Sequence, residues 1–207
     1  MRPLPRLLAF TDDRVAALDD LGGRSAAIAA VGSAAALVAR RPTGSTDELV
    51  QLAERLMRIT QPLMASVLVT GRADVAVAVA AQGVVLREGD LPVPDVRKLA
   101  RGPLWCFRSV HSEVEADAAV AAGADALVVG TIWPTPTHPE RTPSGPQMLA
   151  RVVARGLPCF AIGGVTPERA REAHDAGAWG VAAIRALWDD ADPYGAAHAL
   201  IEPWLEQ

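Results

Sequence analysis

The sequence predicts a single α/β domain, residues 1–207, folded as a (β/α)8 TIM barrel. Eight short apolar runs typical of buried strands alternate with eight alanine-rich segments of helical spacing. This alternation is typical of parallel sheets, and eight repeats are the number that closes a barrel. An open doubly wound sheet is the second architecture, but no G-x-G-x-x-G fingerprint follows a strand.

The predicted strands are three or four residues long and consist mostly of Val, Leu, Ala and Phe. Apart from Ser66 they have no polar side chain, as expected where both faces of a parallel sheet are covered. In chain order they are 7–10, 36–39, 66–69, 84–86, 104–107, 126–129, 159–162 and 180–183.

The predicted helices lie between these runs. The one at 167–176 has the clearest signals: Thr166 as N-cap, Pro167 at the first helical position, Glu168 in the first turn and Gly177 after the end. All eight, in order, are 25–31, 46–59, 73–81, 93–100, 113–122, 147–154, 167–176 and 194–205. With 207 residues, near the fold's lower limit of about 200, we expect few additions to the barrel.

Composition excludes several classes of function. A net charge of −4, one Tyr and three Phe offer neither a basic face nor the stacking surface that nucleic-acid binding needs. The N-terminal ten residues have too short an apolar stretch for a signal peptide or a membrane span, so we expect a cytoplasmic protein without membrane contact. Cys106 and Cys159 lie inside apolar runs and are predicted to be small buried thiols.

Barrel enzymes place their chemistry after the strands. The segment 163–167 combines Gly163 and Gly164, which allow close backbone approach, with a helix N-terminus that attracts anions. We therefore predict an anion site there, although two glycines can also serve only a tight turn. The loop after the eighth strand should lie beside it.

The apolar run 104–107 is followed directly by a mostly polar segment, Arg108 to Ser112. It contains His111, whereas His174 and His198 fall on helices away from the expected active face. His111 is thus the histidine placed to transfer protons near neutral pH. The proline-rich segment 130–145 predicts a lid-like loop over the barrel mouth, and His138 within it is interpreted as exposed.

Four segments give the chain a family resemblance. Phe10-Thr11-Asp12-Asp13, Thr70-Gly71-Arg72-Ala73-Asp74, Arg108-Ser109-Val110-His111-Ser112 and Ala161-Ile162-Gly163-Gly164-Val165-Thr166-Pro167 resemble the thiamine phosphate synthase superfamily over nearly the whole chain. Its two relevant branches are the synthase, which joins a pyrimidine pyrophosphate to a thiazole phosphate, and the TenI-like thiazole tautomerases, which aromatise a thiazole carboxylate phosphate.

The chain departs from the synthase pattern at several positions. Synthases resemble one another in Gln-Leu-Arg-x-Lys after the second strand, Asn-Asp-Arg after the third, an acidic residue after the fourth and Thr-x-Thr-Lys in the long loop, which hold Mg²⁺ and pyrophosphate. In the first motif, this chain has Val38 at the Gln position, Arg40 at the Arg position and Pro42 at the Lys position. The Asn-Asp-Arg triplet is replaced by Thr70-Gly71-Arg72. The acidic residue is kept as Asp90, and His138 replaces the lysine of the long loop. Because one carboxylate makes a poor Mg²⁺ site, we expect the tautomerase branch, with no metal and no cofactor.

The resemblance implies roles for single residues. His111 would be the acid/base, Ser109 and Arg108 would orient the substrate, and Gly163, Gly164, Ala183 and Ile184 would hold its phosphate. Arg40 is a candidate for binding the substrate carboxylate, because a guanidinium pairs with it through two hydrogen bonds. Asp90 is interpreted as a helix-entry residue, and Arg185 either adds charge at the phosphate or points outward.

Three functions stay open on the sequence: a thiazole tautomerase, a thiamine phosphate synthase with a degenerate metal site, and a non-catalytic protein that binds thiazole or thiamine phosphates. All three take a small phosphorylated heterocycle as ligand. The oligomeric state is also open, a homo-oligomer included.

Overall fold

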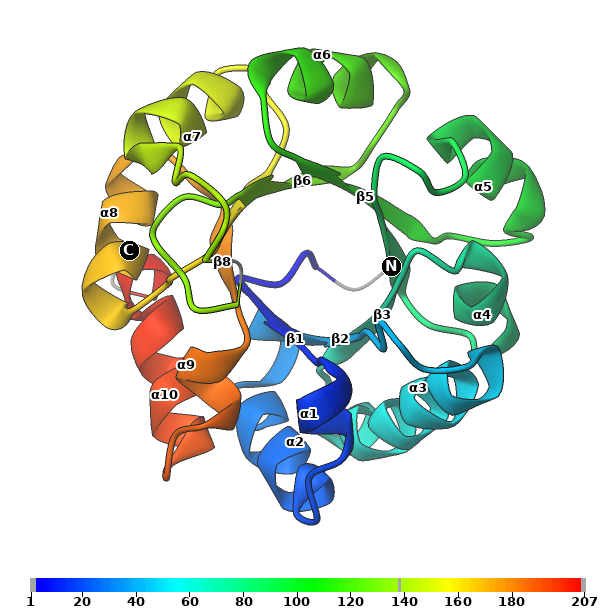
Figure 1. Ribbon diagram of the computed structural model, residues 1–207. Helices are drawn as coiled ribbons and strands as arrows, with labels where there is room; N and C mark the ends of the chain where they lie inside the picture. Colours follow the sequence, from blue (N-terminus) through cyan, green and yellow to red (C-terminus); the bar gives the residue numbers. More distant parts are fainter. Residues whose placement is uncertain (1–2, 138, 206–207) are drawn as a thin grey trace.

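The computed structural model describes residues 3–137 and 139–205, which form a closed barrel of eight parallel strands (Figure 1). Each strand pairs with the next in chain order, and β8 closes the ring by pairing with β1. The predicted fold class is confirmed. His138 lies outside the described residues.

The strands alternate with helices that form the outer layer (Figure 1). The strands are β1 Leu7–Phe10, β2 Ala35–Ala39, β3 Ser66–Thr70, β4 Gly83–Leu86, β5 Trp105–Val110, β6 Ala126–Gly130, β7 Cys159–Ile162 and β8 Gly180–Ala183. The α-helices are α1 Asp13–Ala16, α2 Leu21–Ala29, α3 Thr46–Thr60, α4 Ala73–Ala78, α5 Val93–Leu99, α6 Glu113–Ala121, α7 Gly145–Val153, α8 Pro167–Asp175, α9 Arg185–Trp188 and α10 Pro193–Ile201. No described helix has both the length and the apolar character needed to cross a membrane.

The main difference from the sequence prediction is the length of β5, which continues through Val110 instead of ending at Phe107. Its last residues pair with β6 up to Val110↔Val129. Polar residues are compatible with a strand at this point because one face of it looks into a cavity. The short helices α1 and α9 were also not predicted, since four residues carry no periodic signal.

Two apolar clusters lie on the two sides of the barrel wall. The larger one fills the space between strands and helices. The smaller one fills the barrel itself and is built around Phe107 and Phe160, whose rings stack with centroids 5.5 Å apart. Because side chains alternate along a strand, residues two apart share the inner face. This alternation decides which polar residues reach the barrel mouth.

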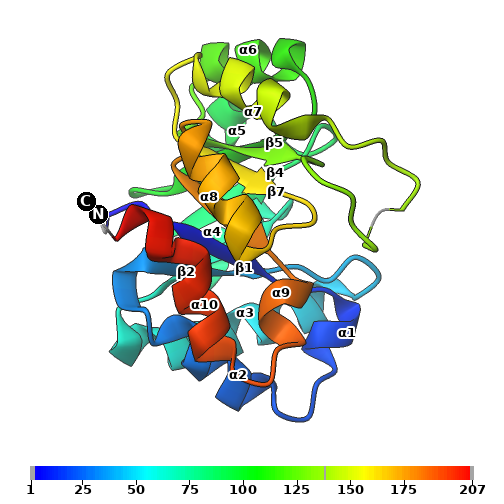
Figure 2. The same ribbon diagram turned by 90° about the vertical axis from the view of Figure 1, so that its left-hand side faces the viewer.

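The two ends of the barrel differ. At the amino ends of the strands, Arg6 stacks on the Trp179 ring at 3.7 Å, and the Trp179 indole N–H donates to the carbonyl of Pro5 at 2.8 Å. At the carboxyl ends, the loop between β6 and α7 extends beyond the strands on the same side as α1 and α9 (Figure 2). Because barrel enzymes have their active sites at the carboxyl ends of the strands, we expect the functional site at this second end.

The two cysteines provide a test of the packing. Both are buried and free, as predicted. Burial raises the pKa of the Cys106 thiol to about 11 and that of Cys159 to about 12. We expect neither thiol to react with a disulfide reagent at about pH 8 in the native protein, because the thiolate is the reactive form.

Both thiols should react once the protein is unfolded in guanidinium chloride. The same shifts imply that stability falls above about pH 8.5, since the unfolded thiols lose protons there while the folded ones keep them. Rapid labelling of the native protein would contradict this packing.

Candidate active site

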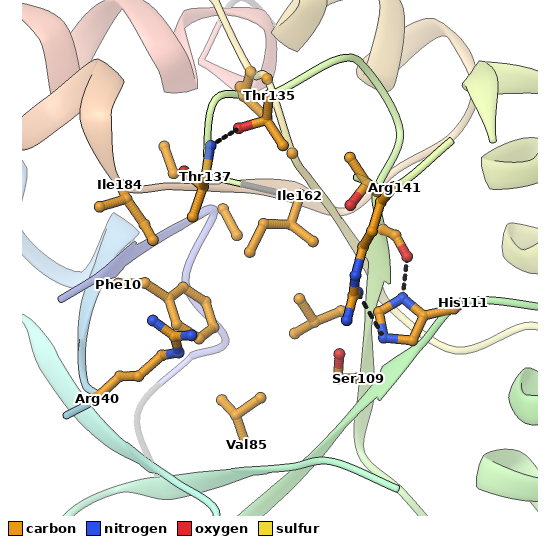
Figure 3. A pocket seen from close by; sticks show the side chains of 18 of the residues that line it. Phe10, Arg40, Val85, Ser109, His111, Thr135, Thr137, Arg141, Ile162 and Ile184 are labelled. Atoms are coloured by element: carbon orange, nitrogen blue, oxygen red, sulfur yellow. Dashed lines mark hydrogen bonds between the residues drawn. The ribbon is translucent and has the colours of Figure 1, made fainter. Parts of the chain in front are cut away.

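A cavity of about 880 Å³ opens at the carboxyl ends of the strands. Each of the eight strands contributes to its lining, either by one of its own residues or by the residue after it. The apolar part of the cavity is lined by Phe10, Val85 and Ile162 (Figure 3). Val128 also lines it, and all four residues lie in or against the apolar cluster inside the barrel. The rim is polar and contains most of the residues that the sequence singled out.

Seven of the eight predicted site residues line this one cavity: Arg40, Ser109, His111, Gly163, Gly164, Ala183 and Ile184. The eighth, Arg108, is not among the lining residues, although it was expected to orient the substrate. The reason is the extra length of β5, whose alternation turns Phe107 and Ser109 inward and Arg108 outward. The Arg108 guanidinium instead donates to the backbone carbonyl of Arg87 at 2.9 Å.

His111 directly follows β5 and continues its inner face two residues beyond Ser109. Its Nδ1 hydrogen-bonds the carbonyl oxygen of Gly130 at the end of β6 (Figure 3). A carbonyl only accepts, so Nδ1 carries the proton, and Nε2 of the neutral ring is left as the basic nitrogen. Nε2 lies 3.5 Å from an Nη1 of Arg141. The backbone N–H of His111 donates to Glu115 Oε2 at 2.9 Å, which further fixes its position.

The predicted anion turn lies where β7 meets α8. Gly163 and Gly164 both have positive φ, +99° and +65°, and Thr166 caps α8 by accepting from the backbone N–H of Arg169. A Cβ on Gly164 would come within 2.3 Å of the carbonyl oxygen of Pro134 in the long loop. The close approach of the two segments thus requires glycine here.

The long loop that we expected to lie over the barrel mouth contributes to the rim. The backbone N–H of Trp133 donates to the Gly163 carbonyl at 3.1 Å, and this bond ties the start of the loop to the predicted anion turn. Further along, Thr135, Thr137 and Arg141 line the cavity (Figure 3).

Arg40 follows β2 and its side chain projects into the cavity near Phe10 (Figure 3). Its backbone is held by Thr11, which is fully buried: the Arg40 amide donates to Thr11 Oγ1, and the Thr11 hydroxyl donates back to the Arg40 carbonyl, both at 2.9 Å. Burial lowers the pKa of the Arg40 guanidinium, an effect that Asp12 and Asp13 oppose.

The residues after β3 and β4 do not fit a magnesium site. Both oxygens of Asp90 bind the Arg87 guanidinium, at 3.1 Å to Nε and 3.2 Å to Nη2, and Oδ2 also accepts the Arg87 backbone N–H at 2.7 Å. The neighbouring position is Gly71, which offers no carboxylate. Among the described residues no group of three His, Cys, Asp or Glu side chains is arranged to hold a metal ion.

The cavity lining also includes residues that were not predicted as site residues, among them Thr70, Arg87 and Arg141. Arg87 could have been found, because it lies two residues beyond the inward-facing Val85. Arg141 comes from a loop without periodicity and gave no signal. Asp90 does not start α5, whose N-cap is Pro92, but closes the turn that carries Arg87. Arg185, the first residue of α9, is exposed and lies at the rim of the cavity.

Comparison with known proteins gives a consistent result. The sequence model of the family described as "Thiamine monophosphate synthase" matches residues 7–187. A thiamine-phosphate synthase of Mycobacterium sp. (strain JLS) is 37% identical over 161 residues, 77% of this chain and 71% of the relative. One from Caldivirga maquilingensis is 34% identical over 168 residues, 81% of this chain and 82% of the relative.

A solved structure extends the similarity to the fold. The thiamine phosphate pyrophosphorylase from Pyrococcus furiosus superposes with a TM-score of 0.84 at 30% identity, over 99% of this chain and 98% of that one. These proteins are named as synthases or pyrophosphorylases. The tautomerase branch, which the sequence analysis favoured, is thus not the one that their names indicate.

Proposed function

The chain belongs to the thiamine monophosphate synthase family, and we propose that it is an isomerase of thiamine biosynthesis that aromatises a thiazole carboxylate phosphate by proton transfer through His111. One observation carries the proposal. The Nδ1 of His111 is committed to the Gly130 carbonyl, so that the lone pair of the neutral ring is on Nε2 at the cavity rim. Arg141 Nη1 lies 3.5 Å from Nε2, and this contact has to give way when Nε2 acts as a base.

The reaction balances without any added group. His111 Nε2 removes the proton from the ring carbon that bears the carboxylate, and the electron pair of that C–H bond becomes part of the aromatic ring. The exocyclic double bond becomes single, and its side-chain carbon receives a proton from the imidazolium. The base is regenerated, and one histidine serves in both directions.

The ends of such a substrate have complementary partners in the cavity. The phosphate fits the turn at Gly163 and Gly164 beside Ala183 and Ile184, where backbone N–H groups and the first turn of α8 favour an anion. The carboxylate fits Arg40, whose guanidinium is suited to a two-oxygen acceptor. Ser109 shares a strand face with His111 and is available to orient the ring.

A second candidate is the synthase reaction, because it is the activity in the names of the relatives. A cavity of about 880 Å³ is also large for one small heterocycle. Against it stands the poor fit of Asp90 and Gly71 to Mg²⁺, which needs several hard oxygen ligands in octahedral geometry beside the substrate phosphates. A divalent ion, where bound, supplies charge neutralisation for a leaving pyrophosphate.

Two parallel assays distinguish these candidates. The first follows the absorbance change on aromatisation of the thiazole carboxylate phosphate, with EDTA present. The second follows pyrophosphate release from the pyrimidine pyrophosphate and thiazole phosphate over a range of Mg²⁺ concentrations. We expect acceleration only in the first assay. Release only in the second would establish the synthase, and binding without turnover in either would make the protein a non-catalytic binder.

A further inference from the structure

Three polar side chains meet in one corner of the site, which we call the β2–β4 corner: Arg40, Thr70 and Arg87. They line the main cavity, and they also line a smaller adjoining cavity of about 120 Å³ toward the start of α3. Each comes from the carboxyl end of its strand or from the residue after it. This corner lies apart from the glycine turn that is suited to the phosphate.

Arg87 is held as a fixed cation. Asp90 accepts from its Nε and Nη2, and these two bonds use one edge of the guanidinium. A guanidinium has five N–H donors, so three remain for another acceptor. The backbone on either side of this group is also tied, because Arg108 donates to the Arg87 carbonyl and the Arg87 amide donates to Asp90.

The polar groups of the other two side chains of the corner, Thr70 and Arg40, have no hydrogen-bond partner in the described part of the chain. The Thr70 hydroxyl is buried, with the residue 9% exposed, and its Oγ1 has no hydrogen-bond partner. Among the residues that the structure describes, the Arg40 guanidinium makes no hydrogen bond or ion pair. Burial lowers the pKa of Arg40 most, and repulsion by Arg87 lowers it further. A buried hydroxyl without a partner is a costly arrangement. Asp12 and Asp13 offset part of the positive charge of Arg40, and Asp90 offsets that of Arg87, so that a bound anion would add to an existing compensation.

The position of Arg87 also explains the missing carboxylate. A Cβ on Gly71 would lie 2.8 Å from Arg87 Nη2 and 3.1 Å from each oxygen of Asp90. A carboxylate at position 71 would therefore adjoin that of Asp90, in the pairing a divalent cation needs. In this chain the guanidinium occupies that space.

We propose that Arg87 replaces a divalent metal as a built-in cation, and that the β2–β4 corner binds the second anionic group of the substrate without metal. The group has charged oxygens that take hydrogen bonds from the Arg40 and Arg87 guanidinium groups, beside the buried Thr70 hydroxyl. The identity of this group rests on the proposed function, which makes it the carboxylate of the thiazole carboxylate phosphate. In a synthase the same oxygens would belong to pyrophosphate.

The test compares two ligands that differ only in this group. Isothermal titration calorimetry, with EDTA present, measures the affinity for the aromatic thiazole carboxylate phosphate and for the thiazole phosphate that lacks the carboxylate. Both are unreactive toward isomerisation, so the result is independent of the proposed activity. We expect Arg87→Gln to weaken the carboxylated ligand by about 10- to 100-fold and the other ligand by less than about threefold.

The matched control is Arg58→Gln on α3, which pairs with Glu54 at 3.9 Å and lines neither cavity. It should bind both ligands as the wild type does. Equal weakening of both ligands by Arg87→Gln, or no weakening of either, would overturn the proposal. So would a wild type that needs Mg²⁺ to bind the carboxylated ligand. Inorganic pyrophosphate as a third probe distinguishes the two sources of the anion, because tight binding of it alone would assign the corner to pyrophosphate.

A double variant tests the exchange of guanidinium for metal directly. Gly71→Asp with Arg87→Gly restores a second carboxylate beside Asp90, and Asp is among the residues that tolerate the φ of +74° at position 71. We expect this variant to bind Mg²⁺ and to bind the carboxylated ligand only when Mg²⁺ is present. A folded double variant that ignores Mg²⁺ would show that Arg87 does not stand in a metal's position.

Discussion

His111→Asn is expected to lower kcat for aromatisation of the thiazole carboxylate phosphate by about 10²- to 10⁴-fold, the usual contribution of a general acid/base. The amide of Asn can still donate to the Gly130 carbonyl, but it cannot take and return a proton. The substrate phosphate is held elsewhere, at Gly163 and Gly164, so the affinity for thiazole phosphate should stay within about threefold of the wild type. Steady-state kinetics and calorimetry measure the two effects separately.

The matched control is His198→Asn on α10, which is not among the residues lining the cavity. Its kcat should equal that of the wild type. If His111→Asn were as active as the wild type, His111 would not be the proton carrier. A parallel loss of ligand binding and activity would make its role structural.

Gly164→Ala is expected to have the second large effect, on phosphate binding. The new Cβ would lie 2.3 Å from the Pro134 carbonyl oxygen, so either the turn or the long loop has to move. The backbone at φ +65° adds a strain of about 1–2 kcal/mol for any residue other than glycine. We expect the affinity for thiazole phosphate to fall at least about tenfold, because the N–H groups of the turn lose their alignment.

Gly123→Ala is a control that adds the backbone strain of a positive φ without a steric clash of the new Cβ. Gly123 has a similar φ of +79°, but a Cβ there would meet no atom within 4 Å. This control should lose about 1–2 kcal/mol of unfolding free energy in a denaturant titration and bind thiazole phosphate normally. Normal binding by Gly164→Ala as well would remove the turn from the phosphate site.

Most of the barrel could be predicted from the sequence because its strands are apolar on both faces. Several predicted boundaries coincide with the observed ones, as for β1, β7 and β8. The predicted strand 104–107 ends too early because Arg108 and Ser109 interrupt the apolar run, and a polar residue normally marks the end of a buried strand. In the barrel this strand reaches the polar mouth before it ends.

Residue type alone singled out His111, the two glycines of the turn and Arg40, and the structure places them in the lining of one cavity. Their roles in binding and catalysis stay predictions. Arg87 was missed because it was read as part of a loop, and its meaning depends on Asp90 and Gly71, which only the fold brings beside it. The finer assignment to the tautomerase branch stays a proposal, since the relatives are named as synthases.

We propose that one cavity holds the phosphate at the glycine turn and presents the reacting carbons to His111. A crystal structure with the thiazole carboxylate phosphate product bound tests it most directly. We predict the phosphate at Gly163 and Gly164 and a distance of about 3–3.5 Å from His111 Nε2 to the exocyclic side-chain carbon. A phosphate in the β2–β4 corner, or a histidine farther from that carbon than one bridging water spans, would contradict the account.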